Sequence, residues 1–200
     1  ARRVPVDVDG FLEDVADRFA HRRITRERPV YWSVSDFAAR QDEAGRDWVI
    51  EPFLERGERM LIVASVGTGK SVVMRQMAVA AAAGVNPFLL SEMKPLRTLT
   101  VDLENPDGVV IRSLKRLDRI ARWSPDFDED RAAVWHMPAG VNIRVSAGFD
   151  MLDDVIADHA PDLLALGPLY KLFRNMPKES DEDAALDVVA RLDDLRARHR

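Results

Sequence analysis

Residues 60–71 read MLIVASVGTGKS, and they determine the fold class. The first five of these residues form an apolar run that is typical of a buried strand in a parallel sheet. Gly67 and Gly69 then permit backbone torsions that a Cβ would forbid. The Ala-rich run from Lys70 to Ala83 is typical of a helix. The stretch therefore predicts a strand, a tight glycine turn and a helix.

The turn matches the pattern of a phosphate-binding loop, GxxxxGK[ST], except that Ala64 replaces the first glycine. Such a loop turns its amides inward at a helix N-terminus and so binds an anion. We expect the Lys70 ammonium to contact the β and γ phosphates as a catalytic residue, and the Ser71 hydroxyl to bind Mg²⁺. A glycine turn with an exposed lysine is the weaker alternative. The residues predicted to bind the nucleotide are Ser65, Val66, Gly67, Thr68, Gly69, Lys70, Ser71 and Val72.

Further strand and helix patterns alternate along the rest of the chain. The expected strands are 97–103, 133–137 and 163–166, and the expected helices begin near Pro106, Ser146 and Ser180. Alternation of this kind predicts an α/β domain with a mainly parallel sheet flanked by helices. Ligands of such sheets bind outside the carboxyl ends of the strands.

Two acids lie at the carboxyl end of the strand at 97–103, in the order Asp102-Leu103-Glu104. Period-2 alternation predicts that Asp102 and Glu104 share one face of the strand. At that position Glu104 is a candidate to polarise the water that attacks a γ-phosphate. A solvated carboxylate ahead of Pro106 is the alternative.

Composition limits the class of protein. The chain has 200 residues, no cysteine and a net charge of −5, from 29 basic and 34 acidic side chains. It therefore has no disulfide or thiolate metal site, and no apolar stretch approaches the ~20 residues of a membrane span. We expect a cytoplasmic protein without membrane contact, and a segment of a longer chain. Residues 1–45 read as a short helical arm or linker, and residues 46–200 as the main domain.

Three blocks together resemble a known family. They are WVIEPFLERGERMLIVASVGTGKS (48–71), RTLTVDLENPDGVVIRSLKRL (97–117) and PDLLALGPLYKLF (161–173). They are similar to RecA-like P-loop ATPases of the RepA type, the AAA-labelled proteins of plasmid, phage and actinobacterial replication modules. The resemblance covers residues 46–200. It implies a RecA-like core that uses ATP and Mg²⁺, Glu104 as the catalytic glutamate, and a helicase-like motor that forms a homo-oligomeric, hexamer-type ring.

The sequence departs from this family at Gly167, where the strand of the third block commonly ends in an aspartate that holds Mg²⁺. Asp102 is the nearest replacement and is predicted as a metal ligand with Ser71. Asp162 stands at the other end of the strand, about 16 Å away at 3.3 Å per residue. We therefore expect nucleotide binding with weak hydrolysis.

The resemblance also implies that the loop after residue 167 contacts single-stranded DNA, through Lys171, Arg174 and Lys178. A solvated loop is the alternative. For the whole protein, the alternative to a DNA motor is a regulatory or adaptor module that binds nucleotide and hydrolyses little of it. A small-molecule kinase ranks lower, because no lid with paired arginines is recognisable.

Overall fold

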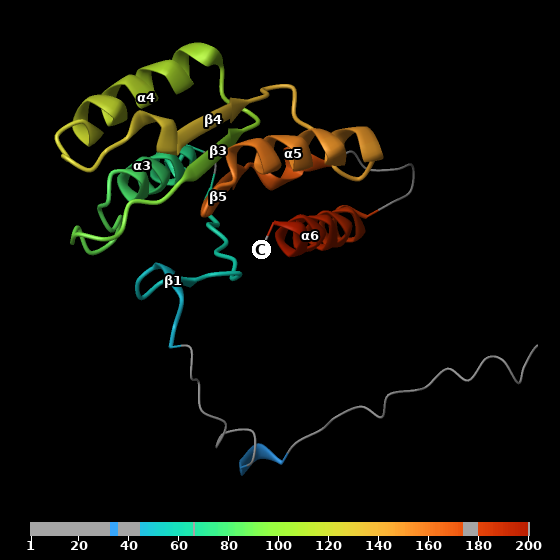
Figure 1. Ribbon diagram of the computed structural model, residues 1–200. Coiled ribbons are helices and arrows are strands. Elements are labelled where there is room, and N and C mark those ends of the chain that lie inside the picture. Colours follow the sequence, from blue (N-terminus) through green and yellow to red (C-terminus); the bar gives the residue numbers. More distant parts are fainter. Residues whose placement is uncertain (1–32, 36–44, 66, 174–179, 200) are drawn as a thin grey trace, which may run out of the picture. The chain divides into compact units, whose positions relative to one another are not determined.

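The computed structural model (Figure 1) describes residues 33–35, 45–65, 67–173 and 180–199. The chain divides into two units, Ala1–Gly45 and Arg46–Arg200. The helical arm predicted for residues 1–45 lies almost wholly outside the described residues. No helix in the described part of the chain combines the length and the apolarity needed to cross a bilayer.

Three parallel strands form the sheet of the second unit. In spatial order they are β4 (Ala132–His136), β3 (Thr98–Asp102) and β5 (Leu163–Gly167). The central strand β3 is buried along its whole length. The pairing places Asp102 beside His136 of β4 and beside Gly167 of β5. The predicted parallel sheet is confirmed, and the carboxyl ends of its strands meet in one row.

Helices cover both faces of this sheet (Figure 1). They are α3 (Lys70–Ala82), α4 (Asp107–Ala121), α5 (Ser146–His159) and α6 (Asp181–Arg198), with two short 3-10 helices, η1 (Glu129–Arg131) and η2 (Leu169–Leu172). On one face, α3 contacts β3, β5 and α4. On the other, Phe149 and Leu152 of α5 and Val188 of α6 join Leu99 and Val101 of β3 in the main core cluster. Burial of each large apolar side chain of this kind contributes about 1.5–3 kcal/mol.

Local signals in the sequence set where two of the helices begin. Ser180 caps α6, because its hydroxyl accepts a hydrogen bond from the Asp183 amide at 3.1 Å. Pro106 immediately precedes α4, a position where its missing N–H has no consequence. Both boundaries confirm the predictions made from the sequence.

A small antiparallel hairpin precedes the phosphate loop and consists of β1 (Trp48–Ile50) and β2 (Leu54–Glu55). Its apolar residues Ile50 and Leu54 pack with Met77 and Ala81 of α3 in a second core cluster. The hairpin is therefore held against the helix that carries the phosphate loop.

The strand predicted at 60–64 is wrong. These five residues form no strand, and all are exposed, with Leu61 at 76% and Val63 at 81% of full exposure. Apolar composition indicates a tendency to be buried, whereas a strand also needs a sheet edge beside it. No short-range pattern specifies that partner, so the sequence alone overstates the order of this run.

Candidate nucleotide-binding site

The phosphate loop is built from two glycines with left-handed backbone torsions. Gly67 has φ +81° and Gly69 has φ +93°, a region that residues with a Cβ rarely adopt. Between them, the Thr68 hydroxyl donates a hydrogen bond to the Ser65 carbonyl at 2.7 Å and holds the turn closed. Gly69 stands directly before α3 and gives the helix no side-chain cap. The amides of Lys70 and Ser71 are therefore available to an anion, whereas the Val72 amide donates to the Gly69 carbonyl at 2.9 Å.

Lys70, the first residue of α3, turns its side chain back into the loop. Its Nζ donates to the Ala64 carbonyl at 2.5 Å and to the Ser65 carbonyl at 2.8 Å. The ammonium group is thus held against the loop by two of its carbonyl groups. Ser71 and Val72 follow on the first turn of α3, and Val66 lies outside the described residues.

These observations fit a bound phosphate chain. A Cβ placed at Gly67 or Gly69 would meet no heavy atom within 4 Å, so the loop has open space in front of it. Free amides, a helix N-terminus and a cation border that space, which is the arrangement that binds the phosphates of a nucleotide. Lys70 would neutralise phosphate charge there, and Ser71 would offer a hydroxyl to Mg²⁺.

Asp102 lies at the end of β3, fully buried, and forms an ion pair with Arg75 of α3. Its carboxylate also accepts hydrogen bonds from the Asn105 amide at 3.0 Å and from both the Asn105 side chain and the Glu104 amide. Burial alone would raise the pKa of Asp102, but the hydrogen bonds from Arg75 and Asn105 outweigh it and hold that pKa below its ordinary value. Asp102 is therefore an ionised, internally bonded group.

This geometry separates the two metal ligands predicted from the sequence. Ser71 remains exposed enough to bind an ion, whereas the carboxylate of Asp102 is occupied by Arg75 and Asn105. A contact between Asp102 and Mg²⁺ stays a prediction. It would require the carboxylate to give up hydrogen bonds from Arg75 or Asn105 in order to bind the ion. Among the described residues, no group of three or more acidic or histidine side chains is arranged to hold a metal ion.

Glu104, the predicted catalytic glutamate, lies on the turn after β3. The strand ends at Asp102, so the alternation expected to align the two acids stops there, and Glu104 is exposed while Asp102 is buried. The Glu104 carboxylate accepts a hydrogen bond from the Tyr170 hydroxyl of η2 at 2.5 Å. Glu104 is thus on the same edge of the sheet as Gly167, with its carboxylate at the surface.

Gly167 ends β5 and places no carboxylate beside Asp102. A Cβ built at this position would lie 3.7 Å from the Met74 sulfur of α3, an ordinary contact. Asp162 is at the opposite end of the strand, where it accepts hydrogen bonds from the Arg97 amide at 3.0 Å and from Arg56 at 3.2 Å. As predicted, it does not replace the missing carboxylate.

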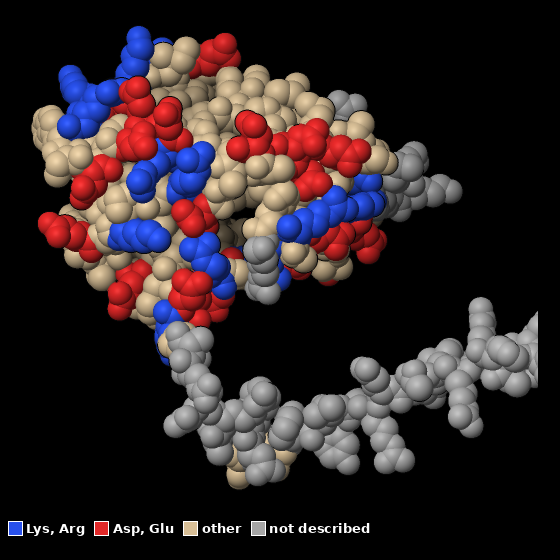
Figure 2. Space-filling view, in the orientation of Figure 1, with Lys and Arg blue, Asp and Glu red and all other residues tan. Residues whose placement is uncertain are grey.

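The predicted DNA-contacting residues are only partly described, because Arg174 and Lys178 lie outside the described residues. Lys171 is half-buried on η2, with its ammonium 3.5 Å from the Pro138 carbonyl and 6.0 Å from the ring of Tyr170. On the face shown in Figure 2, acidic and basic side chains are interspersed. That face favours no broad electrostatic contact with nucleic acid.

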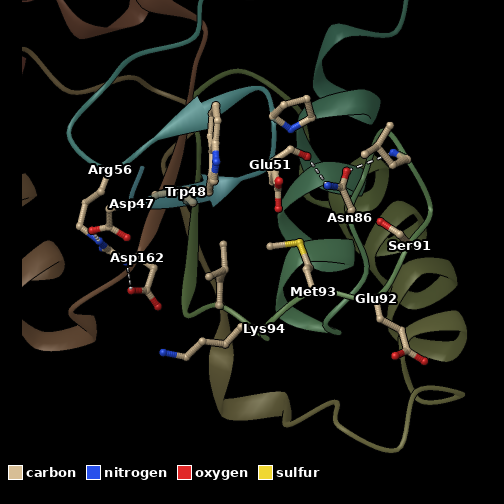
Figure 3. A pocket seen from close by; sticks show the side chains of 14 residues that line it. Asp47, Trp48, Glu51, Arg56, Asn86, Ser91, Glu92, Met93, Lys94 and Asp162 are labelled. Atoms are coloured by element: carbon tan, nitrogen blue, oxygen red, sulfur yellow. Dashed lines mark hydrogen bonds and ion pairs between the residues drawn. The ribbon is translucent and has the colours of Figure 1, made fainter. Parts of the chain in front are cut away.

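A cavity of about 440 Å³ lies at the other end of the sheet (Figure 3). Leu96 and Asp162, which line it, come just before β3 and β5. Its other walls include Trp48, Glu51, Arg56, Asn86, Met93 and Lys94. Because ligands of open α/β sheets bind outside the carboxyl ends of the strands, we assign the nucleotide to the phosphate loop and not to this cavity.

Two residues near the site were missed by sequence reasoning. Arg75 is the only charged residue between Lys70 and Gly84, and a lone charge in an Ala-rich helix was a usable signal of a buried ion pair. Tyr170 carried no such signal, because it lies 66 residues from its partner Glu104.

The comparison with known families agrees with this site. A family model described as an AAA domain (AAA_25) matches residues 21–200. A search of curated protein sequences finds no match. The matched region holds the phosphate loop, Asp102 and Glu104 at the end of β3, and the whole parallel sheet. The chain therefore belongs to the AAA domain family of P-loop ATPases and is a nucleotide-binding ATPase.

Proposed function

We propose that this ATPase is a helicase-like motor of the RepA type that acts on DNA in replication or recombination. The observation that carries the proposal is the phosphate loop with Lys70 at the start of α3, together with Glu104 at the carboxyl end of the central strand. Lys70 binds the phosphates, Ser71 contacts Mg²⁺, and Glu104 orients the attacking water. The loop after β5, with Lys171, contacts single-stranded DNA.

The motor works as a homo-oligomeric ring of hexamer type in this proposal. Its support is the resemblance of the three sequence blocks to ring-forming RecA-like ATPases. Size-exclusion chromatography with light scattering, with and without ATP, tests it. A ring mass supports the proposal, and a monomer under all conditions contradicts it.

A regulatory module that binds ATP and hydrolyses it slowly is the second candidate. It is favoured by Gly167, which leaves the end of β5 without a carboxylate, and by the ion pair that occupies Asp102. Bound Mg²⁺ supplies charge neutralisation on the transferred phosphoryl group, so one missing ligand lowers turnover more than it lowers binding.

Measuring Mg²⁺-dependent ATP hydrolysis with and without single-stranded DNA tests the proposal. We expect turnover to rise with DNA and to be abolished by Lys70→Ala. Lys94→Ala is the matched control, because Lys94 is an exposed lysine at the opposite end of the sheet. Its turnover should equal that of the unmodified protein.

The same variants separate the two candidates. Absent turnover, with ATP still protecting the unmodified protein but not Lys70→Ala against heat, would favour the regulatory module. Turnover that is unchanged by Lys70→Ala would contradict both, because neither allows hydrolysis without this lysine.

A further inference from the structure

The hydrogen bond between Tyr170 and Glu104 links two strand ends that are far apart in sequence. The Tyr170 hydroxyl donates to Glu104 Oε1 at 2.5 Å. Tyr170 belongs to η2, directly after β5, and Glu104 follows β3. Both side chains are exposed, and Tyr170 is 54% exposed. The bond therefore lies at the surface, on the edge of the sheet that ends in Asp102 and Gly167.

The rest of η2 is attached to the core. Leu172 is fully buried in the main core cluster. The Lys171 carbonyl accepts a hydrogen bond from the Val141 amide at 3.0 Å, and the Leu172 carbonyl accepts one from the Ile143 amide at 2.9 Å. Because these contacts do not involve the Tyr170 ring, its bond to Glu104 can open without loss of the loop's position.

The bond has a chemical consequence for Glu104. A carboxylate that orients water must offer an oxygen lone pair to it. A phenol bound to that oxygen competes for the lone pair, through a hydrogen bond of the strong, charge-assisted kind. Consistent with this, the bond to Glu104 raises the pKa of Tyr170 above 10.0, because it stabilises the neutral phenol beside a negative charge.

We propose that Tyr170 is a positioning residue that holds Glu104 in a resting orientation, and that the bond opens when Glu104 turns to the attacking water in the nucleotide-bound protein. This inference rests on the proposed function, in which Glu104 orients that water. It assigns the end of β5 a restraining role in place of the missing carboxylate.

A titration of Tyr170 tests the bond without any measurement of hydrolysis. The chain has 2 tyrosines, so Tyr31→Phe leaves Tyr170 as the only phenol. In that background, ¹³Cζ-tyrosine NMR should show Tyr170 titrating above 10.0, and Glu104→Gln should lower its pKa. Addition of Mg²⁺ and a non-hydrolysable ATP analogue should also lower the pKa of Tyr170. Far-UV circular dichroism at each pH confirms that the fold persists.

Kinetics test the restraint itself. Tyr170→Phe, which keeps the ring and removes the hydroxyl, should raise kcat about tenfold without changing KM, the scale of one hydrogen bond to a charged group. Glu104→Gln should abolish turnover both in the otherwise unmodified protein and in the Tyr170→Phe variant. A purely structural role for the hydroxyl would instead lower thermal stability and leave kcat unchanged.

The outcomes distinguish this inference from the proposed function. If the unmodified protein hydrolyses ATP and Tyr170→Phe leaves kcat unchanged or lowers it, the inference is overturned and the function stands. If the protein has no turnover, the proposed function fails, and the titration alone decides the inference. A Tyr170 pKa that neither Glu104→Gln nor the nucleotide analogue lowers overturns it.

Discussion

The carboxyl ends of β3 and β5 lie side by side, but only one of them carries a charged side chain. β3 ends in Asp102, whose buried carboxylate accepts five hydrogen bonds from four donor groups of Arg75, Glu104 and Asn105. β5 ends in Gly167, which has no side chain to offer. A count of acids near the phosphate loop is therefore a poor guide to which of them is free to bind an ion.

The difference also separates stability from catalysis. The Asp102–Arg75 pair is fully buried, so removal of either partner leaves an uncompensated charge in the core. The end of β5 leads instead to Tyr170 and Glu104, which are exposed and joined by a hydrogen bond at the surface. Changes at β3 should act on folding, and changes at β5 should act on turnover.

The largest expected effect comes from breaking the buried pair. Arg75→Met should lower the free energy of unfolding by about 3–5 kcal/mol, because Asp102 stays buried without its cation. Urea denaturation followed by circular dichroism measures this. Arg122→Met is the control, because Arg122 pairs with Asp118 and Glu129 at the surface, and it should change little.

A double variant sharpens this result. Arg75→Met combined with Asp102→Leu should recover part of the lost stability, since both charges are then absent from the core. A double variant less stable than Arg75→Met alone would show that the cost comes from packing and not from the unpaired carboxylate.

A smaller loss of unfolding free energy is expected when the pH is lowered. The pKa of Asp102 is lowered in the folded protein, so its contribution is fully present above the ordinary value of 3.8 and is lost as the pH falls through the folded pKa. Unfolding free energies from pH 7 down to pH 3 should therefore fall more steeply for the unmodified protein than for Asp102→Asn. Parallel curves for the two proteins would contradict this linkage.

The smallest effect on the fold is expected when β5 is made to end in an aspartate, as β3 does. This change should also increase activity. Gly167→Asp adds a carboxylate where a Cβ has only an ordinary contact with Met74. We expect ATP turnover to saturate at a several-fold lower Mg²⁺ concentration. Gly167→Asn is the matched control, with the same shape and no charge. An equal change in both variants would show that the new side chain does not bind the ion.

Much of the fold was predictable because its signals are local. The strands near 98, 132 and 163 and the helices that begin after Pro106 and Ser180 follow from hydrophobic period, capping and turn chemistry. The run at 60–64 was not predictable in the same way. Its apolar composition is a local property, whereas its exposure depends on which sheet edge lies beside it.

The candidate site divides in the same manner. The binding residues around Gly67, Gly69 and Lys70 were predicted from their order alone, because consecutive backbone amides form a phosphate-binding loop. The roles predicted for Asp102 and Glu104 rest only on their residue type and their place at the end of a strand. Their surroundings come from Arg75 and Tyr170, which are 27 and 66 residues away in sequence.

By itself, the sequence determined that this chain is an α/β protein with a phosphate-binding loop at the start of a helix, because consecutive residues encode the glycine turn and the helix, and strand and helix patterns alternate after them. Only the tertiary structure decided that Asp102 is bound to Arg75, that Tyr170 donates a hydrogen bond to Glu104, and that Gly167 lies beside Asp102. The physical reason is that the availability of a charged group depends on burial and on partners from other elements, which chain order does not specify.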